Sequence, residues 1–166
     1  MKSLALALFL LSSTAVAKTP WEAYLDHPTS ANAERVQAIA YSTPIEGSYD
    51  ADDLAILRLQ VVAADPAAFG LAYRLDETSD GALAEELSAI LADAIRPNPA
   101  FFLAQVKALD QPCAKFNVDV AGLEYVDRPD AQQYELEMRR QALASVASPS
   151  LAGVRDECLA RLGAVH

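Results

Sequence analysis

The chain has few of the residues on which most catalytic and metal sites depend. Its 166 residues include two histidines, two cysteines and one tryptophan. Neither His27 nor His166 has a Cys, Asp or His at the spacing of a zinc or copper site. The motifs Gly-x-Ser-x-Gly, Ser-x-x-Lys and His-Glu-x-x-His do not occur. We therefore expect no cofactor and no catalytic residues of these kinds, and the composition favours a protein that is not an enzyme.

The chain also lacks an apolar run of the roughly 20 residues that a membrane-spanning helix needs. Its one short apolar run, residues 4–11, follows Lys2 and precedes Ala15-Val16-Ala17. This order is typical of a secretory signal peptide that is cleaved after an Ala-x-Ala site. We expect residues 1–17 to be removed and residues 18–166 to form one domain, located in the periplasm or, alternatively, secreted.

Basic residues are scarce relative to acidic ones. The chain has 13 Lys and Arg residues and 23 Asp and Glu residues, which gives a net charge of −10. Because the basic residues are spread evenly, they form no positive stripe for a phosphate backbone, and we expect no nucleic-acid partner. The acidic surface either keeps the protein soluble or steers basic partners towards it.

The two cysteines, Cys113 and Cys158, are most simply explained as a disulfide in an oxidising compartment. The bridge would close a loop of about 46 residues and stabilise the fold by roughly 4 kcal/mol. Two buried thiols and a redox role are the alternatives, although the Cys-x-x-Cys spacing of redox enzymes is absent.

Four helix starts are marked by a residue that can cap a helix, followed directly by proline. They are Thr19-Pro20, Asp65-Pro66, Asn98-Pro99 and Ser148-Pro149. Together with apolar residues at helical spacing, they predict an all-α fold of about seven or eight short helices. The predicted helices span residues 20–27, 30–41, 51–64, 66–75, 80–95, 99–109, 129–147 and 149–163.

One internal echo bears on the architecture. Asp65-Pro66-Ala67-Ala68-Phe69 recurs about 33 residues later as Asn98-Pro99-Ala100-Phe101-Phe102, and apolar positions upstream match at the same offset. Repeated helix pairs are typical of helical-repeat stacks. The period fades beyond residue 110, so a compact irregular bundle that reuses one cap is the alternative.

Residues 111–128 break the helical pattern. Phe116, Val118 and Val120 alternate with polar residues, which predicts extended strands and a small hairpin. Because this segment follows Cys113, the disulfide would tether it to the last helix. We call residues 114–128 the arm. We expect its exposed side chains to bind a partner, and the candidates are Phe116, Asp119, Glu124 and Tyr125.

Two other features have competing interpretations. Asp76, Thr78 and Asp80 precede Gly81 as in the first half of an EF-hand loop, which predicts a weak calcium site, or else a simple helix cap. The distal glutamate of such a loop is missing, because the corresponding position is Leu87. Trp21 and Tyr24 lie on one helical face and form either a partner anchor or a contact with the core.

We expect an exported, non-catalytic protein that binds another exported protein, for example as an inhibitor or immunity-type protein. A small cell-wall hydrolase is one alternative, since glycoside hydrolysis needs only two carboxylates, such as Asp52, Asp53 or Glu86. An envelope scaffold built from helical repeats is the other.

Overall fold

The computed structural model describes residues 17–40, 51–122, 125 and 127–163. These residues form eight α-helices and several short 3-10 helices, with no β-strand among them. The α-helices are α1 (Pro20–Asp26), α2 (Ser30–Ala40), α3 (Ala51–Val62), α4 (Pro66–Thr78), α5 (Gly81–Asp93), α6 (Pro99–Leu109), α7 (Pro129–Ala144) and α8 (Ala152–Gly163). The 3-10 helices include η1 (Cys113–Phe116) and η3 (Pro149–Leu151). The predicted all-α fold class is confirmed. Each predicted helix begins and ends within three residues of an observed one, and the predicted helix 149–163 corresponds to η3 and α8 together.

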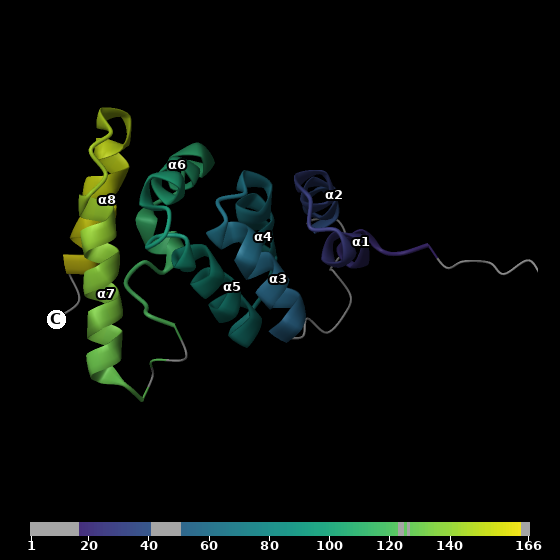
Figure 1. Ribbon diagram of the computed structural model, residues 1–166, viewed down its shortest axis with the longest axis horizontal. Coiled ribbons are helices and arrows are strands. Elements are labelled where there is room, and N and C mark those ends of the chain that lie inside the picture. Colours follow the sequence, from purple (N-terminus) through teal and green to yellow (C-terminus); the bar gives the residue numbers. More distant parts are fainter. Residues whose placement is uncertain (1–16, 41–50, 123–124, 126, 164–166) are drawn as a thin grey trace, which may run out of the picture.

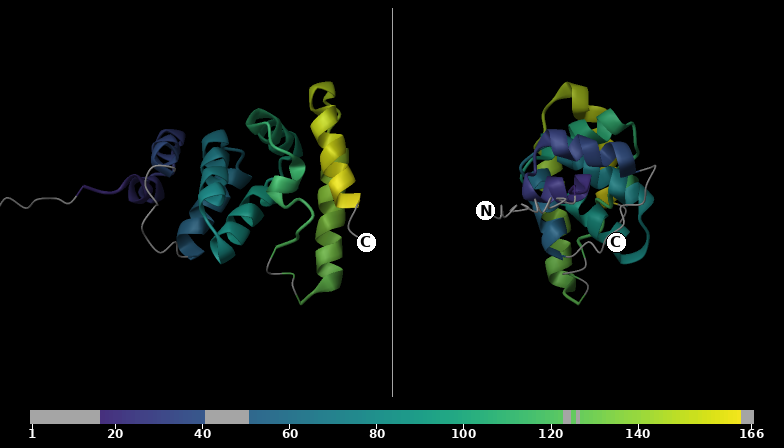
Figure 2. Two further views of the ribbon diagram at one scale, coloured as in Figure 1. Left: turned by 180° about the vertical axis from the view of Figure 1, so that it is seen from behind. Right: turned by 90° about the vertical axis from the view of Figure 1, so that its right-hand side faces the viewer.

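The helices follow one another in chain order along the long axis of the molecule. Helices α1 and α2 lie at one end and α7 and α8 at the other (Figure 1), and the view from behind in Figure 2 shows the same order. Helix α2 packs against α4, while α5 packs against both α3 and α4. Helix α8 contacts α6, α7 and η1. Each helix therefore buries its apolar face mainly against helices that are close to it in the sequence.

The echo in the sequence corresponds to equivalent core positions in two successive helix pairs, α3–α4 and α5–α6. Phe69 and Phe102, which the echo matches, are both fully buried, and their ring centroids lie 6.1 Å apart. Leu57 and Ile90, matched in the preceding helices, are also fully buried. The repeated residues therefore fill the same core.

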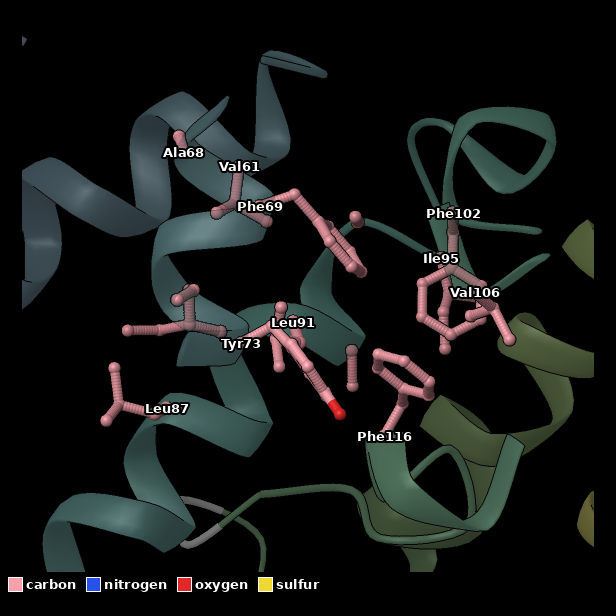
Figure 3. Close-up of a cluster of buried hydrophobic side chains, with 14 of the residues drawn as sticks. Val61, Ala68, Phe69, Tyr73, Leu87, Leu91, Ile95, Phe102, Val106 and Phe116 are labelled. Carbon is pink, nitrogen blue, oxygen red and sulfur yellow. The ribbon is translucent and has the colours of Figure 1, made fainter. Parts of the chain in front are cut away.

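An aromatic cluster occupies the centre of this core (Figure 3). The ring of Phe116 from η1 lies 5.7 Å from that of Tyr73, 5.9 Å from that of Phe102 and 6.1 Å from that of Phe69. Burial of each such side chain contributes about 1.5–3 kcal/mol. The 3-10 helix η1, which leads into the arm, is therefore part of the core.

Two of the four predicted helix caps form as expected. Thr19 Oγ1 accepts a hydrogen bond from the Glu22 backbone N–H at 3.1 Å, and Glu22 Oε2 accepts one from the Thr19 N–H at 2.7 Å. Asp65 Oδ1 accepts from the backbone N–H groups of Ala67 and Ala68. These bonds satisfy donors that the first turn of a helix leaves unpaired.

The other two side chains lie at the predicted helix starts but do not cap them. Asn98 Nδ2 instead donates to the carbonyl oxygen of Val62, the last residue of α3, at 2.7 Å. Ser148 Oγ lies 3.0 Å from Ser150 Oγ. Asn98 thus satisfies a carbonyl at the end of one helix while its backbone begins another.

Helix α1 is held against the rest of the molecule by its aromatic face. Trp21 and Tyr24 are both buried, and their rings stack with centroids 5.7 Å apart. Trp21 Nε1 donates to Asp53 Oδ2 of α3 at 3.4 Å. Of the two interpretations of this pair, the contact with the core is therefore confirmed.

Candidate functional site

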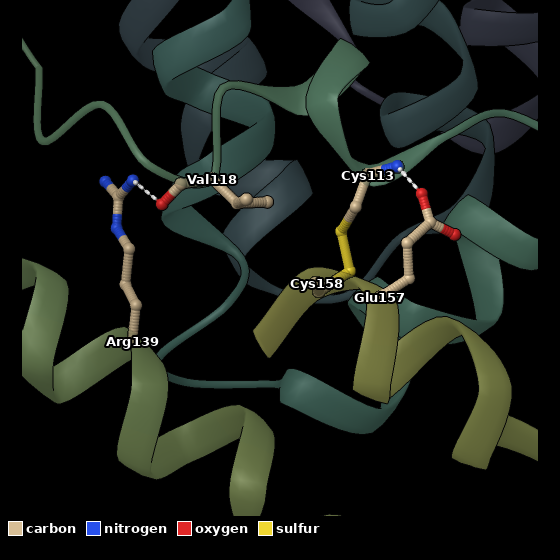
Figure 4. Close-up of a disulfide and its surroundings, with 5 residues drawn as sticks. All are labelled: Cys113, Val118, Arg139, Glu157 and Cys158. Carbon is tan, nitrogen blue, oxygen red and sulfur yellow. Dashed lines mark hydrogen bonds between the residues drawn. A yellow bond between two sulfur atoms is a disulfide. The ribbon is translucent and has the colours of Figure 1, made fainter. Parts of the chain in front are cut away.

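The arm begins at the predicted disulfide, which the structure contains. Cys113 of η1 and Cys158 of α8 are bonded, with their Cα atoms 5.2 Å apart, and both are fully buried. The Cys113 backbone N–H also donates to Glu157 Oε1 at 2.8 Å (Figure 4). One covalent bond and one charge-assisted hydrogen bond therefore join the start of the arm to the last helix.

The predicted hairpin is wrong for the part of the arm that is described. The chain leaves η1 through Asn117 in the left-handed conformation, with φ 45°, and continues without pairing to a strand. The alternation does correspond to burial, because Phe116 and Val118 are fully buried. Their burial is against helices, however, so the pattern arises without a neighbouring strand. Val120, the third apolar residue of the alternation, is 49% exposed.

The carbonyl groups of the arm are bound by an arginine from α7. Arg139 is 1% exposed, and its Nη1 donates to the carbonyl oxygen of Val120 at 2.7 Å and to that of Val118 at 3.4 Å. Figure 4 shows the guanidinium reaching from α7 to the Val118 carbonyl. In a hairpin a partner strand would bind these carbonyls, so Arg139 takes the place of that strand.

A buried carboxylate compensates the charge of this arginine. Glu135 Oε1 lies 3.1 Å from Arg139 Nε, and Glu135 Oε2 lies 2.7 Å from Nη1 of Arg96, which follows α5. Glu135 therefore links α7, the end of α5 and, through Arg139, the arm. Glu135 and Arg139 are not among the residues predicted from the sequence, although their i, i+4 spacing on one helix is the signal for such a pair.

A second ion pair holds the middle of the arm. Asp119 Oδ2 lies 2.8 Å from Arg161 Nη2 of α8, and the Asp119 side chain is only 10% exposed. The arm is thus fixed to α8 at Cys113 and Asp119 and to α7 through Arg139.

Two cavities lie beside the arm. A groove of about 610 Å³ is lined from α3, α5, the arm and α7 by residues that include Val62, Asp93, Arg96, Tyr125, Glu135 and Met138. A smaller cavity of about 330 Å³ lies between α5 and the arm, lined by Glu85, Ala89, Asn117, Val120 and Gly122. Figure 1 shows the arm running between α5 and α7. The arm therefore contributes to both hollows.

The four predicted contact residues have different environments. Phe116 is fully buried in the aromatic cluster, so the expectation that it is exposed is wrong. Asp119 is largely buried in its ion pair with Arg161. Tyr125 is half-buried and lines the larger groove. Glu124 lies outside the described residues.

The predicted calcium residues have separate partners. Asp76 and Thr78 belong to the last turns of α4, where Asp76 Oδ1 accepts from Ser88 Oγ at 2.8 Å and Thr78 Oγ1 donates to the Arg74 carbonyl at 3.1 Å. Asp80 precedes α5 and makes no cap hydrogen bond with its side chain. In the described part of the chain, no three His, Cys, Asp or Glu side chains come together as a metal site would require.

The carboxylates considered for hydrolysis also have their own roles. Asp53 accepts the Trp21 hydrogen bond, and Glu86 Oε1 accepts from Arg58 Nη2 at 2.8 Å. Asp52 is exposed in the first turn of α3. Glu86 thus forms an ion pair that joins α5 to α3, and Asp53 accepts a hydrogen bond that holds α1 against α3.

Comparison with known proteins adds no family. No protein-family model, curated protein or solved structure matches the chain. Within the described residues, no helix has the length and apolar character needed to cross a membrane. The predicted signal peptide is residues 1–17, of which only Ala17 is described. The buried disulfide is compatible with an exported protein.

Proposed function

We propose that this protein is exported and acts by binding another exported protein, with the arm as the centre of the contact surface. Inhibition of that partner, as by an immunity-type protein, is the activity we favour. The predicted signal peptide and the disulfide support export. The observation that supports the proposal most directly is that a disulfide, the hydrogen bonds of Arg139 and the ion pair of Asp119 fix the arm to α7 and α8.

A non-helical segment of this length normally loses considerable conformational freedom when it binds a partner. Here much of that cost is already met in the free protein, because the disulfide, Arg139 and the ion pair of Asp119 restrict the arm. Loops that carry binding residues are typically presented in this way by a rigid scaffold. A restricted arm with a hollow beside it is therefore suited to recognition of a protein surface.

Val120 is the side chain through which this proposal can be tested. It is 49% exposed and lines the smaller cavity, whereas its backbone carbonyl accepts the hydrogen bond from Arg139. A substitution at Val120 therefore changes the surface of the arm while the groups that hold the arm remain.

The experiment is a quantitative pull-down from envelope extract with the oxidised protein as bait. We expect one stoichiometric partner, at least a tenfold loss with Val120→Lys, and full retention with Leu59→Lys. Leu59 is the matched control because it is 65% exposed and lines neither cavity. Equal capture by Val120→Lys and the unmodified protein would contradict the role of the arm. Turnover of peptidoglycan fragments by the protein would favour the cell-wall hydrolase instead.

A further inference from the structure

Among the described residues, the lining of the smaller cavity between α5 and the arm combines apolar walls with one carboxylate. Ala89, Val120 and Gly122 contribute apolar surface, Asn117 contributes a polar group, and Glu85 is an exposed acid in the lining. Its volume of about 330 Å³ is at the lower end of the range for sites that bury a small ligand or one long side chain.

The carboxylate of Glu85 is available for a ligand. Among the described residues, Glu85 takes part in no ion pair or side-chain hydrogen bond, whereas the neighbouring Glu86 is paired with Arg58 at 2.8 Å. The whole chain carries a net charge of −10, so the long-range field also attracts cations. Among the described residues the Glu85 carboxylate has no partner, and it lies beside apolar walls. Such a site is complementary to a side chain that carries a positive charge at the end of a chain of methylene groups.

We infer that this cavity binds a basic side chain, lysine or arginine, of the partner protein. The inference rests on the proposed function, since it names the chemistry that the arm recognises. The methylene groups of the basic side chain would cover Ala89 and Val120, and its charged end would pair with Glu85. Lysine and arginine both have an aliphatic stem and a charged end. They differ in that arginine can donate two hydrogen bonds to one carboxylate.

The test uses short capped peptides, Gly-Lys-Gly, Gly-Arg-Gly and Gly-norleucine-Gly, titrated into the oxidised, isotope-labelled protein as isolated from the cell. Norleucine has the aliphatic stem of lysine without the charge. In amide NMR spectra we expect saturable shifts with a basic peptide, confined to the residues of the cavity, and about three- to fivefold weaker binding in Glu85→Gln, as for a partly exposed ion pair. Glu34→Gln, which removes one exposed charge on α2, is the matched control and should bind normally.

Three results of the peptide titration would overturn the inference. The first is that the norleucine peptide binds as tightly as the basic peptides. The second is that Glu85→Gln and Glu34→Gln change the binding equally. The third is that the shifts are absent, or spread over the molecule, at peptide concentrations of several millimolar, about the dissociation constant expected for one side chain. The proposed function is judged separately by the pull-down with Val120→Lys. A captured partner that is lost with Val120→Lys but retained with Glu85→Gln would support the arm as a contact surface and reject the basic side chain.

Discussion

Arg139 is the residue on which the position of the arm most directly depends. Its removal takes a donor from two carbonyls of the arm. In the part of the chain that the structure describes, it also leaves the buried Glu135 with Arg96 alone as a cationic partner. Breaking a buried ion pair from one side is strongly destabilising, because the remaining charge stays desolvated. We predict that Arg139→Met lowers the free energy of unfolding by about 3 kcal/mol, measured by urea denaturation near neutral pH.

The control for this substitution lies on the same helix. Glu137 pairs with Arg140 at 3.5 Å, and both side chains are about half exposed. Such surface pairs contribute little, so Glu137→Gln should change the free energy of unfolding by less than about 1 kcal/mol. Similar effects of the two substitutions would mean that the buried network does not stabilise the arm.

A second single residue, Asp76, makes the stability of the protein depend on pH. Burial raises the pKa of its carboxyl above the ordinary value, and Glu77 adds to this, while the hydrogen bond from Ser88 and the charge of Lys115 oppose it. The folded protein therefore holds this proton more tightly than the unfolded chain. The stability that this provides is complete below the ordinary pKa and is lost as the pH rises through the folded pKa.

Asp76→Asn keeps an oxygen that can accept the Ser88 hydrogen bond but cannot ionise. We predict that it becomes progressively more stable relative to the unmodified protein as the pH rises from about 3 to about 7. Urea denaturation across that range measures the difference. Asp80→Asn, the same change at an exposed position four residues later, is the control. A difference that stayed constant with pH would contradict the prediction.

At the scale of elements, Asn98 connects the end of one helix to the start of another. Its Nδ2 group donates to the Val62 carbonyl, so the amide nitrogen is the atom that matters. We predict that Asn98→Asp lowers the free energy of unfolding by at least about 1 kcal/mol, even though Asp is as good a helix cap as Asn. Thermal or urea denaturation measures the loss.

The matched change is at the echoed position. Asp65 caps α4 through Oδ1, an atom that Asn retains, so Asp65→Asn should change the free energy of unfolding by no more than about 0.5 kcal/mol. If Asn98→Asp were equally mild, the bond to α3 would contribute nothing and Asn98 would be an ordinary helix start.

The helices could be predicted because the signals that begin them are local. A capping residue before proline acts within one turn, and apolar residues at helical spacing show which face is buried. The structure of the arm depends on residues far away. Phe116 packs against α4 and α6, and the carbonyls of Val118 and Val120 are bound by Arg139, about 20 residues later. Alternating apolar residues show which side chains are buried, but they do not distinguish a partner strand from a helix.

At the scale of the whole molecule, the disulfide joins the α7–α8 end to the rest. The two cysteines are 45 residues apart, and the bridge encloses the arm and α7. We predict that Cys113→Ala with Cys158→Ala lowers the free energy of unfolding by about 2–4 kcal/mol, measured by urea denaturation. The unmodified protein reduced by a dithiol serves as the comparison, because it loses the bond without losing the sulfur atoms. Unchanged stability in both forms would contradict the prediction.

From the order of helices along the molecule we expect a corresponding order of events in folding. Helices α1 to α6 pack largely on near neighbours, and loops between such elements close rapidly. The arm can take its final position only when α7 supplies Arg139 and α8 supplies Cys158 and Arg161. The last residues of the chain are therefore needed before the arm is complete, and until then Cys113 is an unprotected thiol. A chain interrupted before α8 would retain many of its helices while lacking the surface through which we propose it binds.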